Sequence, residues 1–126
     1  FLYIRGRTPG FRQVALYRQS DSILRASEGS ARLVPGVTAS AELLDVLGAA
    51  PLLGRGLHEG DDVPGAEPVA LLSFGLWQEM GGNPLIVGTP VTLDGRPRTV
   101  IGVMPRGFWF PDPSVRIWTP AELRPD

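Results

Sequence analysis

The chain has 126 residues and a mass of 13.6 kDa, enough for one domain with a modest hydrophobic core and too short for two. Its 16 glycines and 13 prolines exclude long helices and predict a turn-rich domain of short elements. A net charge of −1 argues against a nucleic-acid-binding protein, which needs clustered cationic charge. The absence of cysteine excludes disulfides, thiolate metal sites and cysteine nucleophiles.

The first third of the chain has no sustained hydrophobic period. Apolar residues at 14–17 and 23–24 fit either an interrupted strand or a short helix. Residues 28–30 predict a turn, and residues 32–38 predict a strand. Pro35 confines this strand to a sheet edge or a bulge, because proline has no N–H to donate.

A compact helix is predicted next. Ser40 is a suitable N-cap, and Gly48 is placed to end the helix in a left-handed conformation. Leu43, Leu44 and Leu47 fall on one face of this helix and predict a buried stripe.

The connection over residues 49–65 is rich in glycine, proline and acidic residues, and loops of this length are usually functional or mobile. The apolar run at 68–72 then predicts a central strand that is covered on both faces. Ser73 follows as the predicted N-cap of a second short helix over residues 74–80.

The last segment predicts a β-hairpin. Residues 91–93 and 98–103 flank Asp94 and Gly95, a pair suited to a type I′ turn because both positions need positive φ. Residues 115–118 predict a final short strand. Together, these elements predict an α+β fold with a small mixed or antiparallel sheet, two short helices and a C-terminal β-hairpin.

Motifs for catalysis are weak. His58 is the only histidine, so a Ser-His-Asp triad would need it, but its glycine-rich loop favours an ordinary surface residue. Ser73 lies between a strand and a helix, as in a nucleophile elbow, yet Leu71 stands where G-x-S-x-G needs glycine. We therefore interpret Ser73 as a helix cap.

The acidic loop around His58, Glu59, Asp61 and Asp62 resembles a set of hard-metal ligands. Its spacing does not match an EF-hand loop, and no second ligand set is present in the sequence. We interpret it as a solvated acidic loop and expect neither a metal nor a cofactor.

Three consecutive aromatic residues, Phe108, Trp109 and Phe110, lie between Pro105 and Pro111. Alternation predicts that two of the three side chains point inward and pack in the core. The alternative interpretation is a contact patch, since bulky aromatic side chains suit partner surfaces.

From Val37 to Pro120 the chain resembles the MacB-like periplasmic core domain of FtsX-type ABC transporter permeases, and residues 1–36 resemble it only loosely. The resemblance rests on several short blocks in the same order. These are Val37-Thr38 through Leu47-Gly48, Pro51-Leu52-Leu53-Gly54-Arg55, Pro68 through Trp77, Val87-Gly88, Leu93 through Pro97, Thr99 through Pro105, Gly107-Phe108, Phe110-Pro111 and Trp118-Thr119-Pro120.

The resemblance implies a single non-enzymatic, extracytoplasmic domain over residues 1–126, a piece of a longer permease, without catalytic residues. Its implied partners are the permease's transmembrane helices, a cytoplasmic ABC ATPase acting indirectly, an adaptor protein and a second copy, but no nucleic acid. Nucleotide-driven motion of the helices would then be coupled to export or to signalling. The candidate contact residues are Arg55, His58, Asp61, Asp62, Phe108, Trp109 and Phe110.

Two other functions remain as alternatives. In the first, Trp77, Trp109 and Trp118 form a stacking platform in a free-standing small-molecule or glycan-binding module, which requires at least two exposed indoles. In the second, Ser73 and His58 serve a hydrolase.

Overall fold

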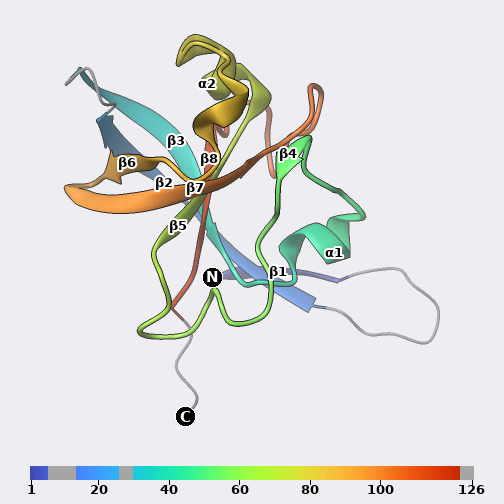
Figure 1. Ribbon diagram of the computed structural model, residues 1–126. Helices are drawn as coiled ribbons and strands as arrows, with labels where there is room; N and C mark the ends of the chain where they lie inside the picture. The colour runs from blue at the N-terminus through green and yellow to red at the C-terminus, as the bar shows by residue number, and fades with distance from the viewer. Residues whose placement is uncertain (6–13, 26–29, 123–126) are drawn as a thin grey trace.

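The structure, a computed structural model, describes residues 1–5, 14–25 and 30–122 (Figure 1). Residues 28 and 29 of the predicted turn lie outside the described residues. Two short α-helices and a single 3₁₀ turn (Pro84–Ile86) accompany the strands. The helices are α1 (Leu43–Leu47) and α2 (Phe74–Glu79), and the strands are β1 (Leu2–Arg5), β2 (Val14–Arg25), β3 (Ala31–Ala39), β4 (Leu53–Gly54), β5 (Val69–Leu72), β6 (Pro90–Leu93), β7 (Arg96–Val103) and β8 (Ile117–Pro120).

Six strands close into a barrel-like ring in the order β2-β3-β8-β5-β7-β6, because β6 pairs with both β7 and β2. The pairs β3–β8 and β5–β7 are parallel, and the other four pairs of the ring are antiparallel. The remaining strands, β1 and β4, pair with β2 and β7 outside the ring. The predicted mixed sheet with two helices is confirmed, whereas closure of the sheet is a feature that the prediction lacks.

The ring closes where β2 meets the β6–β7 hairpin. Leu24 and Leu93 face each other across this contact. One residue further on, the backbone N–H of Ile23 donates to the Asp94 carboxylate at 2.8 Å, and the N–H of Asp94 donates to the Ile23 carbonyl at 2.9 Å. The turn residue of the hairpin therefore fastens β2 as well.

The barrel separates two hydrophobic clusters. The inner cluster takes residues from all six ring strands and from α2, which lies over one end of the ring (Figure 1). The outer cluster lies on the opposite face of the sheet, beneath α1 and the loops. Since all four residues of β5 are buried, the predicted strand covered on both faces is confirmed.

The first third forms strands rather than a helix. β2 is one continuous strand through the exposed polar residues in its middle. β3 is also continuous, and its Pro35 lies where β8 begins, with the Pro35 carbonyl accepting from Arg116 N–H at 2.8 Å. The prediction that Pro35 lies at a sheet edge is confirmed for the part of β3 that contains it, because β8 pairs with β3 only from Gly36 onward.

The predicted caps divide into one that is confirmed and one that is wrong. The Ser73 hydroxyl accepts a hydrogen bond from Leu76 N–H at 3.1 Å and caps α2. Ser40 does not cap α1, since its hydroxyl accepts from Leu16 N–H on β2 and the N-cap position is Glu42. The hydroxyl therefore links the start of α1 to β2, and Gly48 ends the helix with φ +67° as predicted.

The hairpin prediction is confirmed by its turn. Asp94 and Gly95 have φ of +52° and +80°, as a type I′ turn requires. The final strand, β8, begins at Ile117 and therefore lies two residues beyond the predicted start at Val115.

Candidate functional site: the acidic loop and the aromatic segment

Asp61 holds the acidic loop together from inside. Its carboxylate accepts from Arg55 Nη1 at 2.8 Å and Nη2 at 3.3 Å, and from the backbone N–H of His58 at 2.9 Å. Asp61 is 9% exposed, so the solvated acidic loop predicted from the sequence is wrong at this position. A buried carboxylate with three donors is a structural anchor for the loop.

Asp62 fastens the same loop to the neighbouring turn. Its Oδ2 accepts from the backbone N–H of Ala41 at 2.8 Å, a buried contact just before α1. Leu57 follows β4 and packs into the outer cluster alongside Leu43. The loop is consequently fixed to the body of the domain by the Asp62 carboxylate and by the Leu57 side chain, whereas Asp61 bonds only within the loop.

Two of the loop's candidate residues remain accessible. The His58 side chain is 59% exposed, with Nδ1 at 3.0 Å from the Glu59 carbonyl and 3.6 Å from the Asp61 carboxylate. The Arg55 side chain is half-exposed although it pairs with Asp61. The Arg55 and His58 side chains form part of the outward surface of the loop, and the buried Asp61 carboxylate lies beneath them.

The position of Arg55 depends on close backbone packing. Gly54 has φ +67°, and a Cβ at this position would lie 2.0 Å from the Ile101 carbonyl oxygen. Without a side chain, Gly54 lets Arg55 N–H donate to that same carbonyl at 2.8 Å. The close contact of β4 with β7 therefore fixes the backbone position from which the Arg55 side chain extends.

The aromatic segment shows the predicted alternation. Phe110 packs edge-on against Tyr17 with ring centroids 4.8 Å apart, and Phe108 tilts against Trp118 at 5.3 Å. Trp109 points outward and is 54% exposed. Two of the three aromatic residues therefore serve the core, and Trp109 is the one that presents a broad apolar surface to solvent.

The tryptophan platform expected by the binding-module alternative is absent from the described residues. Trp118 is fully buried and Trp77 nearly so, with the Trp77 indole N–H donating to the Asn83 carbonyl at 2.9 Å. A platform requires at least two exposed indoles, and only Trp109 provides one. This alternative is wrong.

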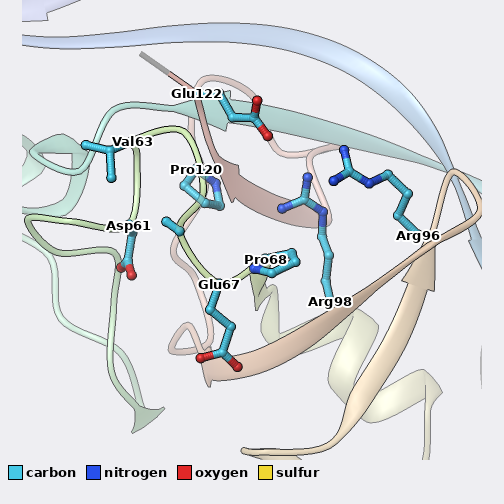
Figure 2. Close-up of a pocket in the computed structure, with 9 residues that line it drawn as sticks. Asp61, Val63, Glu67, Pro68, Arg96, Arg98, Pro120 and Glu122 are labelled. Carbon is cyan, nitrogen blue, oxygen red and sulfur yellow. The ribbon is translucent and has the colours of Figure 1, made fainter. Parts of the chain in front are cut away.

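A small polar pocket adjoins the loop beside the first residues of β7 (Figure 2). The Arg98 guanidinium donates to the Val69 carbonyl at 3.2 Å, and burial together with the neighbouring charge of Arg96 lowers the pKa of Arg98. Figure 2 shows the Asp61 carboxylate pointing away from both arginines. The pocket measures about 30 Å³, room for water and too little for an organic ligand.

Residues 1–5, 14–25 and 30–122 contain no group of three or more His, Asp or Glu side chains placed to hold a metal ion. Within the same ranges, every helix is too short to cross a membrane.

The ion pair of Asp61 should make stability depend on pH. Burial alone would raise the pKa of Asp61, but the hydrogen bonds from Arg55 and His58 N–H and the charges of Arg55 and His58 outweigh it and lower the pKa. The unfolded chain, with a value near 3.8, then binds the proton more readily than the folded chain. This contribution is present above the unfolded pKa and is lost as the pH falls through the lower folded pKa.

Urea unfolding between pH 7 and pH 2 measures this effect. We expect Asp61→Asn to destabilise the domain at pH 7 and to flatten its loss of stability in acid. Asp112, whose pKa is lowered by hydrogen bonds from Ser114 and Gln19, should keep part of the acid dependence in the variant. Asp21→Asn, on an exposed strand position, is the control, and an equal flattening in that variant would contradict the role of Asp61.

The sequence profile of the MacB-like periplasmic core domain matches residues 2–124 and so includes residues 2–36, where the resemblance in the sequence is only loose. A search of curated proteins gave no significant match.

Two solved structures share the fold. The periplasmic region of MacB from Actinobacillus actinomycetemcomitans is 25% identical with a TM-score of 0.67, over 84% of this chain and 46% of that one. The extracellular domain of the noncanonic ABC-type transporter YknZ from Gram-positive bacteria is 20% identical with a TM-score of 0.70, over 89% of this chain and 56% of that one. The chain thus spans about half the length of each solved region.

The expected extracytoplasmic localisation is confirmed, because the matching family and both solved relatives are periplasmic or extracellular regions. The resemblance noted in the sequence is likewise confirmed, and it now extends over almost the whole chain. The chain belongs to the family of MacB-like periplasmic core domains.

Proposed function

We propose that this chain is a non-enzymatic domain of an FtsX/MacB-type ABC transporter permease that couples cytoplasmic ATP hydrolysis to export or to signalling. The observation that carries the proposal is the family match over residues 2–124. The implied partners are the permease's membrane helices, an ATPase on the opposite side of the membrane, an adaptor protein and a second copy of the domain.

The closed ring suits a body that transmits force. Each of its six strands is hydrogen-bonded on both sides over at least part of its length, so the ring resists shear between neighbours. α2 fills one end of the ring and packs into the inner cluster. A stiff domain of this kind can follow a movement of attached helices as a unit, which is what a switching transporter requires.

The exposed surface near the outer cluster is the proposed contact with an adaptor or a second copy. Trp109 offers a broad apolar anchor, the kind of residue that often dominates binding energy at interfaces. Arg55 adds a positive charge on the loop, and His58 adds an exposed imidazole. Four further candidates would position these contact residues: Asp61 and Asp62 hold the loop, and Phe108 and Phe110 hold the aromatic segment.

Thiol labelling of the full-length permease tests the proposed topology. His58→Cys would place a thiol at an exposed position of a domain that has no cysteine. We expect a membrane-impermeant maleimide to label this thiol in intact cells, and Ala70→Cys, at a fully buried site, to stay unlabelled until the protein is unfolded. Labelling of His58→Cys only after lysis would place the domain in the cytoplasm and overturn the proposal.

A further inference from the structure

The first half of β3 has one unpaired edge. Between Ala31 and Pro35, β3 pairs with β2 on one side, whereas β8 reaches it only from Gly36 onward. Pro35 directs its carbonyl toward the β8 side, so Leu33, two residues earlier on the strand, directs its N–H and carbonyl to the same side. Leu33 lies opposite Ile23, whose own N–H and carbonyl bond Asp94 on the far side of β2, so within residues 1–5, 14–25 and 30–122 the Leu33 N–H and carbonyl are left without a partner.

The strand position beside this edge is vacant because the chain turns away before β8. Ser114 N–H donates to the Asp112 side chain, and Val115 N–H donates to the Asp112 carbonyl, so this turn satisfies its own groups. Only at Arg116 does the chain reach β3, through its bond to Pro35. An added strand beside Leu33 would continue the line of β8.

The surface is hollowed into a groove at this vacant strand position. A depression of about 360 Å³ lies between β3, α2 and the turn before β8. A second depression of about 320 Å³ continues past the N-terminal end of α2, and the two share Pro113 and Arg116. The Leu33 side chain, 65% exposed, stands beside the groove with no core role.

The charge of the groove is predominantly positive. Arg32 and Arg116 both reach Glu79 on α2, Arg32 at 3.7 Å and Arg116 through a direct hydrogen bond. Arg106 stacks over the Phe74 ring at 4.6 Å. The two depressions are thus lined by three arginines and one carboxylate, which two of the arginines share, and this excess of cations would be complemented by an acidic ligand.

We propose that this groove binds an extended, acidic segment of a partner protein as an added strand beside Leu33. The free N–H and carbonyl of Leu33 require a backbone in extended conformation, and the excess arginines select Asp or Glu side chains on it. Leu33 and Pro113, exposed apolar residues that line the groove, would contact alternate side chains of the same segment. This inference goes beyond the proposed function, and its test on the isolated chain is independent of membrane topology.

A phage-displayed library of random peptides, panned on the 126-residue chain, supplies the probe. We expect the enriched peptides to be acidic, and synthetic copies of them to slow hydrogen exchange of the Leu33 amide. Leu33→Pro should weaken their binding about tenfold by removing the free N–H. This substitution spares the β2–β3 hydrogen bonds, because Leu33 directs its N–H away from β2 and Pro35 already occupies an equivalent position.

A charge-reversal pair controls for electrostatics. Arg32→Glu, in the groove, should weaken the same peptides about tenfold, whereas Arg96→Glu, on an exposed position of β7 outside the groove, should leave binding within about twofold. If circular dichroism shows that Leu33→Pro does not fold, two measurements still test the proposal. They are peptide binding by Arg32→Glu and the exchange rate of the Leu33 amide in the unaltered chain with peptide bound.

Four results would overturn the proposal. These are no enrichment of peptides, enrichment without acidic residues, binding that is insensitive to both groove variants, and binding that leaves the Leu33 amide unprotected. Self-association of the chain that Leu33→Pro abolishes, measured by sedimentation velocity, would identify a second copy as the occupant and overturn the assignment to a partner protein.

Discussion

Replacing Trp118 with alanine is expected to lower the free energy of unfolding by about 3–5 kcal/mol. Trp118 is fully buried in the outer cluster, where it contacts Phe108, and its indole N–H donates to the Phe110 carbonyl at 3.2 Å. The substitution leaves a cavity and deprives that buried carbonyl of its donor. Urea unfolding monitored by far-ultraviolet circular dichroism measures the change.

Trp109→Ala is the matched control, since it removes the same side chain from an exposed position in the segment that supports Trp118. We expect its unfolding free energy to stay within about 0.5 kcal/mol of the unaltered chain. Equal destabilisation by the two substitutions would show that the aromatic segment does not divide into an inner and an outer part as described.

The second large loss of stability is expected from a substitution at Gly102, where β4 pairs closely with β7. A Cβ at this position would lie 2.4 Å from the Arg55 carbonyl oxygen and 2.7 Å from that of Leu53. Both obstacles are backbone atoms, so β4 must move away if Gly102→Ala is to fold. We expect a loss of about 2–3 kcal/mol, together with faster hydrogen exchange of Arg55 N–H.

Gly75→Ala makes the same chemical change, but we expect it to raise the free energy of unfolding. Its Cβ would meet only the end of the Arg116 side chain, at 3.4 Å, and the position lies within α2. Alanine stabilises helices relative to glycine, so we expect a gain of about 0.5–1 kcal/mol. A loss at Gly75 as large as the one at Gly102 would refute the crowding argument.

Elements that are specified locally could be predicted from the sequence. The turn at Asp94 and Gly95 and the cap at Ser73 each depend on residues within four positions of one another. Ser40 failed as a predicted cap because a distant partner, Leu16 N–H on β2, takes its hydroxyl. Tertiary contacts can override a local preference in this way, and nothing near Ser40 in the sequence indicates it.

That the sheet closes into a ring could not be predicted from the sequence, for a related reason. β2 crosses exposed polar residues, so its hydrophobic pattern is interrupted although its pairing with β3 is continuous. β1 was not predicted at all. Its residues are mostly exposed and form a strand through pairing with the first residues of β2.

The candidate site could be predicted in part. Alternation correctly separated Trp109 from its two neighbours, because the side chains of an extended segment point alternately to opposite sides. The sequence predicted solvated acidic residues in the loop because charge favours exposure, which is right for Glu59 and wrong for Asp61 and Asp62. Their burial follows from three-dimensional partners: Arg55 and His58 N–H for Asp61, and Ala41 N–H for Asp62.

The short contact between β2 and the hairpin turn also has a consequence for how the chain reaches its native state. It joins Leu24 to Leu93, whereas the β6–β7 hairpin forms between neighbours in the chain. Such a distant contact brings a large loss of chain entropy, and only two residue pairs and the bonds of Asp94 compensate for it. We therefore expect the hairpin to form early and its joining to β2, which turns an open sheet into a barrel, to come late in folding.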